Sequence, residues 1–397
     1  MVIHTRWTRN LGGPRVQLEL AEEMRTLGHE VEKLSYEDAF PDVSKTAAPR
    51  RLPGRLGTAV ALARSNRSFA ARARDWVRAR PGRFDVIDAN QTDLPFPKRD
   101  LGFSGLLVAR SVGLIPTYEA FDREAARRWP EPPSLRAWAH RTLTWPGTRR
   151  RRRDVEGSFR HADLINVSNR DDLAAVRDGM GFGLKAVMFP FGLSEERRLA
   201  FLTERAPVAE RLAGRTVAFI GTWNQRKGAR DWPEIAARVR ERVPDARFLV
   251  LGTGLGAELV LRDFPPELRP AVRVVPFYDS AELPGLLSRA AAGAFPGYLE
   301  GFGFAVLEKL AAGLPTVAYD ATGPRDVLGH LAGEPMVPRG DTGAFAARLA
   351  EILTAPAERW AERSAEATRV AALFSWRDIA RRTLDTYQER RQRLAGA

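Results

Sequence analysis

Short apolar runs, which predict strands, alternate along the chain with segments whose apolar residues recur at helical spacing. The start, Val2 to Arg6, is predicted to be a strand, and the segment from Arg15 to Leu27 is predicted to be a helix. In that segment the apolar residues recur at helical spacing: Val16, Leu20, Met24 and Leu27. Gly28 ends the helix, and His29 to Leu34 returns as a strand. The chain therefore opens with a predicted strand–helix–strand unit.

Further strands are predicted from short apolar runs between helical segments. These runs cover residues 84–90, 106–110, 162–168, 216–221, 248–251, 291–295 and 314–319. Strands that alternate with helices are typical of parallel sheets covered by helices, which is an α/β fold. A length of 397 residues is enough for two or more such domains.

The stretch from Phe295 to Leu310 says most about function. It leaves the predicted strand 291–295, passes through a glycine-bearing loop and enters a predicted helix from Phe302 to Ala312. Such a loop lies where doubly wound sheets bind ligands. Gly301 and Gly303 let the backbone approach a ligand closely, and the free N–H groups of the helix start favour an anion.

Two carboxylates make this stretch more specific. Glu300 lies in the loop, and Glu308 follows about two turns into the helix, inside an apolar run. A half-buried acid costs free energy unless it is paired, and sugar or ribose hydroxyls are suitable donors to it. The alternative is that Glu300 is an ordinary loop residue and Glu308 a solvated helix residue.

Together these residues resemble a known family. Glu300-x7-Glu308 with Gly301-Phe302-Gly303 between them is similar to the signature of retaining glycosyltransferases of the GT-B fold, family 4 (glycosyl transferases group 1). The continuation from Leu310 to Ala318, LAAGLPTVA, also resembles that family. The resemblance implies that Glu300 contacts the donor sugar and Glu308 the nucleotide ribose.

The resemblance extends to other glycine-bearing loops and implies further donor contacts. Gly12 and Gly13 would lie near the donor phosphates, although they also fit a tight turn without a ligand. In the second half, the assigned residues lie after predicted strands: Gly221, Arg226 and Lys227 for the diphosphate, and Gly252 and Phe277 beside the base. Cations at a strand end suit a departing diphosphate, whereas isolated basic residues are usually surface charges.

Three positions depart from the family pattern. Val112 stands where many relatives have a histidine that faces the donor. Thr222 takes the place of a usual arginine, and Phe191-Gly192 replaces a common Asn-Gly turn. If the chain is an enzyme of this family, proton handling must then come from the donor phosphate, another residue or water.

Two other functional classes remain open. Gly252-x-Gly254-x-x-Ala257 follows a predicted strand and resembles a dinucleotide fingerprint, which would suit a nucleotide-sugar epimerase or dehydrogenase. That pattern is weak here, because Pro265-Pro266 interrupts the helix that should follow. A binding protein with a catalytically weak site is the other alternative, given Val112 and Thr222.

Composition narrows the remaining classes. The chain has no cysteine, and its five histidines show no ligand spacing, so no metal site is expected. We expect no cofactor, a UDP, GDP or ADP sugar as donor, and a glycan, lipid or small molecule as acceptor. The start has no apolar core long enough for a signal peptide, and a cytoplasmic enzyme is expected.

Charge is distributed unevenly along the chain. The net charge is +13, and residues 1–200 carry 35 basic and 25 acidic side chains. A basic half suggests an anionic partner, such as membrane lipid at the inner face or a phosphate-bearing acceptor. A helix predicted from Leu56 to Arg78 could rest on anionic lipid or pack with a solvated arginine face. The run Arg149 to Arg153, near Trp129, Trp138 and Trp145, could bind nucleic acid, but no matching motif accompanies it, so nucleic acid is not expected. A solvated helix face is favoured for this run, and an acceptor or lipid contact is the next alternative.

The predicted fold is therefore α/β of GT-B type, with two Rossmann-like domains facing across a cleft. Residues 1–205 would form the acceptor-binding domain and residues 206–374 the nucleotide-sugar-binding domain. Residues 375–397 would form a helix that packs back on the first domain. The predicted function is transfer of a sugar, with retention of configuration and without a metal, to an acceptor hydroxyl.

Overall fold

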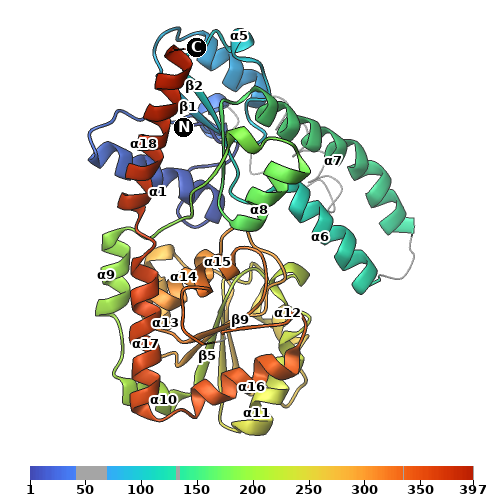
Figure 1. Cartoon of the computed structure of the whole chain (residues 1–397). Coiled ribbons are helices and arrows are strands. Elements are labelled where there is room, and N and C mark those ends of the chain that lie inside the picture. Colours follow the sequence, from blue (N-terminus) through green and yellow to red (C-terminus); the bar gives the residue numbers. More distant parts are fainter. Residues whose placement is uncertain (42–68, 131–134, 334, 397) are drawn as a thin grey trace. The chain divides into compact units, whose positions relative to one another are not determined.

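The protein is described here from a computed structural model of residues 1–41, 69–130, 135–333 and 335–396 (Figure 1). The side chains of residues 135–146 lie outside this description, as do most of the predicted helix 56–78 and the predicted roles of Trp138 and Trp145. The chain divides into two compact units: residues 1–189 with 377–397, and residues 190–376. The sequence prediction had placed these divisions at residues 205 and 374.

The first unit contains a parallel four-stranded sheet in the order β1-β2-β3-β4. Its strands are β1 (Val86–Asn90), β2 (Leu106–Arg110), β3 (Leu164–Val167) and β4 (Ala186–Met188). β2 and β3 are buried along their whole length, which explains their continuous apolar sequence. Helices surround this sheet: α1 (Gly12–Thr26), α2 (Tyr36–Ala39), residues 69–78, α5 (Lys98–Leu101), α6 (Ile115–Arg128), α7 (Leu135–His161) and α8 (Arg170–Ala174), which continues into a π-helical turn (Ala175–Gly179).

Two predicted strands and one predicted loop of this unit are wrong. Residues 2–6 and 29–34 form only isolated parallel bridges, Val2 with both Leu34 and Ala89. One bridged residue is too little for a strand, although Val2 still extends the sheet beyond β1 through its N–H bond to the Asp88 carbonyl, 2.9 Å. Gly12 and Gly13 do not form a loop: they are the first residues of α1, which begins directly after Leu11.

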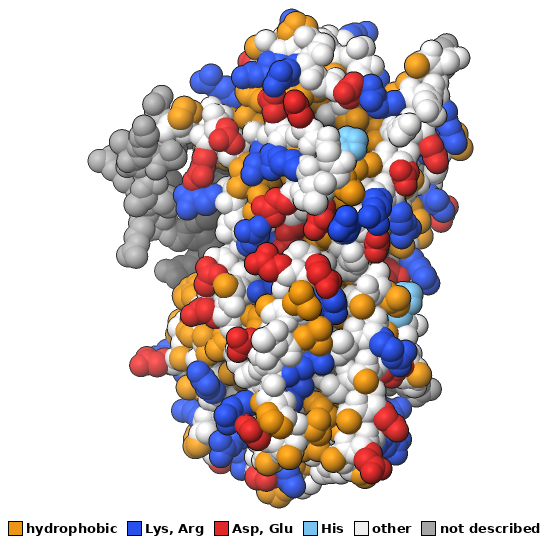
Figure 2. All heavy atoms as spheres, turned by 90° about the vertical axis from the view of Figure 1, so that its left-hand side faces the viewer, with side chains coloured by type: hydrophobic (Ala, Val, Ile, Leu, Met, Phe, Trp, Pro, Cys, Tyr) orange, Lys and Arg blue, Asp and Glu red, His pale blue; other side chains and the backbone are white. Residues whose placement is uncertain are grey.

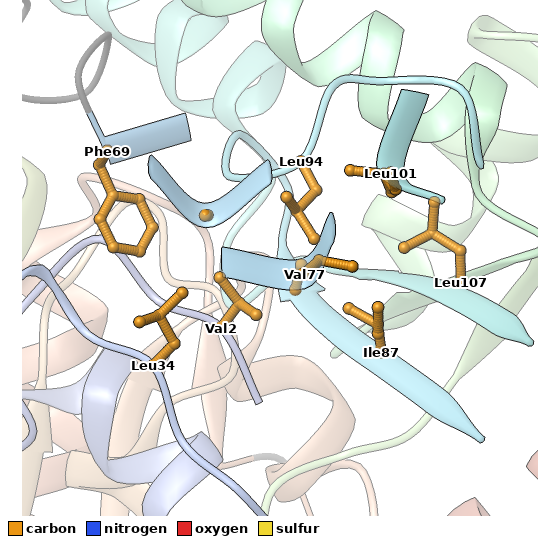
Figure 3. Packing of buried hydrophobic residues seen from close by; sticks show 10 residues of the cluster. Val2, Leu34, Phe69, Val77, Ile87, Leu94, Leu101 and Leu107 are labelled. Carbon is orange, nitrogen blue, oxygen red and sulfur yellow. The ribbon is translucent and has the colours of Figure 1, made fainter. Parts of the chain in front are cut away.

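Residues 69–78, the described part of the predicted helix 56–78, pack into a hydrophobic core. Phe69, Ala73 and Val77 are buried together with Val2 and Leu34 (Figure 3). Two arginines lie outside that cluster: Arg72, on the helix, covers the Phe40 ring, and Arg80, just after the helix, covers the Trp76 ring. This supports the packed helix with a solvated arginine face over a lipid-binding surface.

The second unit contains a parallel six-stranded sheet in the order β10-β9-β8-β5-β6-β7. Its strands are β5 (Thr216–Ile220), β6 (Arg247–Leu251), β7 (Val272–Val275), β8 (Ala292–Phe295), β9 (Thr316–Tyr319) and β10 (Met336–Val337). Its α-helices are α9 (Glu195–Thr203), α10 (Val208–Gly214), α11 (Trp232–Arg242), α12 (Ala257–Leu261), α13 (Leu283–Leu287), α14 (Phe304–Ala311), α15 (Pro324–Leu328), α16 (Thr342–Leu353) and α17 (Ala357–Ala372). All of the predicted strands between residues 216 and 319 are present, within a few residues of the expected bounds.

The last helix, α18 (Trp376–Ala395), belongs to the first unit from residue 377 onward. Tyr387 is buried on it, and its hydroxyl donates to Asp88 Oδ2 at 2.6 Å and accepts from Arg110 Nη2 at 3.0 Å. Arg110 also donates to Asp88 through Nε and Nη2. The helix is therefore fixed to β1 and β2 through a buried charged network.

We expect Tyr387→Phe to lower the free energy of unfolding by about 1.5–3 kcal/mol, because the variant loses a hydrogen bond to a buried carboxylate. Denaturant unfolding followed by circular dichroism would measure this change. Arg381→Ala, on an exposed part of the same helix, is the control and should change stability by less than about 0.5 kcal/mol. Equal unfolding curves for Tyr387→Phe and wild type would contradict the role of the network.

Candidate functional site

A loop of the second unit joins β8 to α14 and carries the stretch singled out from the sequence. The hydroxyls of Tyr298 and Tyr319 both donate to Asp231 Oδ2, at 2.6 and 2.7 Å. The loop ends at Gly303, whose φ of +104° as the N-cap residue of α14 favours glycine. The buried Asp231 therefore fixes the loop just before the helix N-terminus, and sequence reasoning did not identify it.

A short turn after β5 lies directly against this loop. The Arg226 carbonyl accepts from the Tyr298 N–H at 2.8 Å. Gly228 closes the turn with a φ of +79°, and a Cβ there would lie 2.0 Å from the Pro296 carbonyl oxygen. Only glycine permits this approach, which places two cations of the turn beside the acidic loop residue.

Those cations are Lys227 and Arg226, and the acid is Glu300. Lys227 Nζ and Arg226 Nη1 both contact Glu300 Oε2, the second at 3.3 Å, and Arg226 also donates to the Leu299 carbonyl at 3.1 Å. The three side chains are 11%, 25% and 19% exposed, respectively. The structure thus brings together the three residues predicted to be catalytic, in a position that solvent still reaches.

Charge pairing sets the ionisation of this group. Burial by itself would raise the pKa of Glu300, but Lys227 and Arg226 hold that pKa below its usual range. Burial lowers the pKa of Lys227, and Glu300 opposes that shift. We conclude that Glu300 is a carboxylate at neutral pH, and so can accept hydrogen bonds from hydroxyl groups.

Glu308 lies in α14 and is more buried than expected. The prediction was a half-buried acid, whereas Glu308 is 5% exposed. Arg197, on α9, donates to Glu308 Oε1 at 3.1 Å. An acid in an apolar helix face is therefore compensated by an arginine that sequence reasoning missed.

Lys309, the next residue of α14, was also missed. It is fully buried, and its Nζ donates to the Ala294 carbonyl at 2.7 Å. Burial, with a further contribution from Lys227, lowers the pKa of Lys309 well below its usual value. Its stem passes Gly293, where a Cβ would lie 3.0 Å from Lys309 Cδ. The glycine in a buried strand was the available signal, because it leaves room for a neighbouring side chain.

The other predicted donor residues of this unit lie at the carboxyl ends of neighbouring strands. Gly221 follows β5 and Gly252 follows β6, and their N–H groups donate to the Leu251 and Val275 carbonyls at 2.9 Å. Phe277, just after β7, is 76% exposed, which leaves its ring available for stacking. Gly221, Gly252 and Phe277 therefore all lie at the carboxyl ends of the strands, on the same side of the sheet.

The first unit presents fewer of the expected groups. Gly12 and Gly13 begin α1, and a Cβ at Gly13 would lie 3.6 Å from Val112 Cγ2, so the valine stands beside these glycines. His4 Nδ1 lies 2.7 Å from Asp93 Oδ1. Burial would lower the pKa of His4, but Asp93 raises it above its usual value. This imidazole was not singled out from the sequence.

A cavity of about 980 Å³ lies elsewhere in the second unit. Its lining includes Thr216, Arg247 and Val272, the first residues of β5, β6 and β7, so it opens at the amino ends of the strands. Ligands of open α/β sheets bind at the carboxyl ends. We therefore place the candidate site at the carboxyl ends of the strands, with Glu300, Lys227 and Glu308, and not at this cavity.

Comparison with known proteins relates most of the second unit to a described family. Residues 214–355 match the family model described as Glycosyl transferases group 1. The second unit therefore resembles the group 1 glycosyltransferases over most of its length. Phosphatidyl-myo-inositol mannosyltransferase of Mycobacterium leprae is 27% identical over 384 residues, 94% of this chain and 91% of the relative. D-inositol 3-phosphate glycosyltransferase of Thermobispora bispora is 35% identical, but over only 36% of this chain and 34% of the relative.

Solved structures of the same architecture cover the whole chain. Sucrose-phosphate synthase from Thermosynechococcus elongatus gives a TM-score of 0.70 at 20% identity, covering 100% of this chain and 99% of its own. Anabaena Alr3699/HepE, solved in complex with UDP and glucose, gives 0.63 at 14% identity, covering 98% of both chains. The predicted GT-B fold with two Rossmann-like domains is thereby confirmed.

The described residues were also searched for metal-binding clusters and for membrane-spanning helices. Among the residues that the structure describes, no cluster of three or more His, Cys, Asp or Glu side chains could hold a metal ion. Within the same part of the chain, we find no helix that combines the length and the apolar character of a membrane span.

Proposed function

We propose that the protein is a retaining glycosyltransferase that transfers a sugar from a nucleotide diphosphate sugar to an acceptor hydroxyl. The observation that carries this proposal is the placement of Glu300 against Lys227 and Arg226 at the helix N-terminus of α14. Cations, helix amides and an ionised carboxylate at one position suit a ligand that has both phosphate and hydroxyl groups.

Each residue has a distinct proposed role. Glu300 accepts hydrogen bonds from the donor sugar, and Glu308 accepts them from the ribose. Lys227 and Arg226, with the first amides of α14, stabilise the negative charge that develops on the diphosphate as it leaves. Gly221, Gly301 and Gly303 allow the backbone to lie close to the donor, and Gly252 and Phe277 flank the base.

We propose a same-face mechanism, in which the departing phosphate oxygen takes the proton from the acceptor hydroxyl. This suits a site with Val112 in place of the usual histidine, because no side-chain base is then required at that position. The two cations supply the charge compensation that a metal ion would otherwise give. Turnover in the presence of a chelator tests this last point, and loss of activity with EDTA would reject it.

A screen of UDP-, GDP- and ADP-sugars by thermal shift, followed by product analysis with candidate acceptors, tests the proposed function. We expect one nucleotide series to stabilise the protein and a glycoside with retained configuration to form. Reduction of NAD, or conversion of the donor without an acceptor, would instead support an epimerase or dehydrogenase. Donor binding without any turnover would leave a binding protein.

We further propose that the acceptor is a phosphate-bearing, anionic molecule. Residues 1–200 carry a net charge of +10, against +3 for the remainder, and two relatives are named for acting on inositol compounds that carry phosphate. On the face shown in Figure 2, however, basic and acidic side chains are interspersed, so the attraction is not concentrated in one broad patch there. The acceptor site itself must supply the specificity.

We expect the protein to co-sediment with vesicles that contain phosphatidylinositol more than with neutral vesicles, and this difference to fade as salt rises, because exposed charges are screened over about 8 Å at physiological ionic strength. Soluble inositol phosphate should compete if the recognised group is the phosphate. Equal binding to both vesicle types, or none to either, would contradict a lipid acceptor. Failure of inositol phosphate to compete would contradict recognition of the phosphate.

A further inference from the structure

Arg197 occupies an unusual position between two parts of the candidate nucleotide site. It lies on α9, and its Nη2 donates to Glu308 at 3.1 Å. Its Nη1 donates to the carbonyl of Ser280, which follows the loop that carries Phe277 and Tyr278. One guanidinium therefore connects the predicted ribose ligand with the predicted base-flanking segment.

Other contacts keep this guanidinium in place. Its centre lies 4.8 Å from the Phe201 ring centroid, one turn further along the same helix. The Arg197 side chain is 12% exposed, and its Nε is buried without a hydrogen-bond partner among the described residues. Moving the Arg197 side chain would break two directional hydrogen bonds and an aromatic contact, and so would cost free energy.

The neighbouring arginine is a natural contrast. Arg198 lies next in the same helix, is 27% exposed, and pairs with the exposed Glu195 three residues earlier. Such a surface pair adds little stability and touches neither Glu308 nor Ser280. Two adjacent residues of one type thus differ in whether they contact the nucleotide site.

Arg197 could either hold Glu308 for the ribose or compete with the ribose for it. The contact uses one acceptor position on Oε1, and a carboxylate offers about four, so the arginine does not exhaust the capacity of Glu308. Nη2 donates to the carboxylate, whereas Nη1 donates to Ser280 and Nε has no hydrogen-bond partner among the described residues, so Arg197 does not form the two-pronged pair that would block the carboxylate. The geometry therefore favours holding over competition.

We infer that Arg197 is a positioning residue for nucleoside recognition: it sets the carboxylate of Glu308 and the segment at residues 277–280 at the spacing that one nucleoside requires. This inference rests on the proposed function of the same site. In this arrangement Arg197 affects binding of the ribose and the base, whereas Lys227 and Arg226 bind the diphosphate. Arg197 therefore contributes to selection of the nucleoside rather than to departure of the phosphate.

The test compares three probes: the preferred nucleoside diphosphate, its 2′,3′-dideoxy form and inorganic pyrophosphate. In Arg197→Met, we expect the preference for the ribose form to fall by about fivefold to tenfold, the effect of one hydrogen-bonded contact. Inhibition by pyrophosphate should not change. Arg197→Lys should lose the preference too, because one ammonium cannot span both acceptors. Arg198→Met is the control and should behave as wild type.

The outcomes separate this inference from the proposed function. Absence of nucleotide binding in the wild type would overturn the proposed function and this inference with it. Wild-type binding with an unchanged ribose preference in both folded Arg197 variants would overturn the inference alone. Tighter nucleotide binding in Arg197→Met would also overturn it, by showing that the arginine competes with the ribose.

Discussion

Lys227→Ala is expected to lower kcat by about 10²–10³-fold, the loss typical of removing one preorganised donor to a developing negative charge. The ammonium group lies at the end of the turn after β5, against Glu300, and it is only 11% exposed. Its effect should be smaller on KM than on kcat, since it acts on charge that grows as the diphosphate leaves. Steady-state kinetics with the identified donor and acceptor would measure both values.

Two further measurements make this prediction specific. In wild type, Lys227 and Arg226 hold the pKa of Glu300 below its usual range, so Glu300 stays ionised until the pH falls below that lowered value. Without Lys227, burial is opposed less, the pKa of Glu300 rises, and the acid limb of kcat/KM should move to higher pH. Arg238→Ala, which removes an exposed cation paired with Glu234, should change neither kcat nor the pH dependence of kcat/KM. Normal turnover with an altered sugar preference would remove Lys227 from the phosphate site.

Much of the second unit could be predicted from the sequence, because its strands are short apolar runs bounded by glycine or proline. Burial on both faces makes such strands easy to recognise. The first unit was harder. The segments at Val2 and Leu34 extend the sheet through isolated bridges only, and a run of apolar residues does not reveal how many of them are paired. Gly12 was interpreted as a loop residue because glycine commonly marks turns, yet it begins α1.

The candidate site was predictable where its residues are close in sequence. Glu300, Gly303 and Glu308 follow one another within a single loop and helix, so their spacing carries information. Arg197 lies 111 positions before Glu308, and no local pattern relates the two. Asp231 is similar, since it meets two tyrosine hydroxyls that lie 67 and 88 positions away. Only tertiary packing makes these contacts, so a single sequence could not reveal them.

Buried charge is the second reason for the residues that were missed. A lysine in a helix is normally read as solvated, because few lysines are fully buried. Lys309 is an exception that depends on space left by Gly293 and on the Ala294 carbonyl. The same reasoning underestimated the burial of Glu308, whose compensating cation comes from α9. In both cases the partner, and not the residue itself, determines whether burial is tolerated.

Glu308→Gln is expected to weaken binding of the nucleoside diphosphate by about 30-fold, or about 2 kcal/mol, because the ribose hydroxyls lose a charged acceptor. Glutamine is preferable to alanine here, since alanine would leave Arg197 buried without its carboxylate and so threaten the fold. Calorimetric titration of both proteins, with circular dichroism to check folding, measures the effect. Binding of pyrophosphate should be unchanged, as the phosphate contacts lie with Lys227 and Arg226.

The double variant with Arg197→Met decides how these two residues act. If Arg197 works through Glu308, its replacement should cost little ribose preference once Glu308 is already glutamine, so the two effects should not add. Additive losses would mean that Arg197 acts on the nucleotide independently of Glu308. Unchanged nucleotide affinity in a folded Glu308→Gln protein would show that the ribose is not bound at α14. The second carboxylate of the Glu300-x7-Glu308 pattern would then serve only to pair with Arg197.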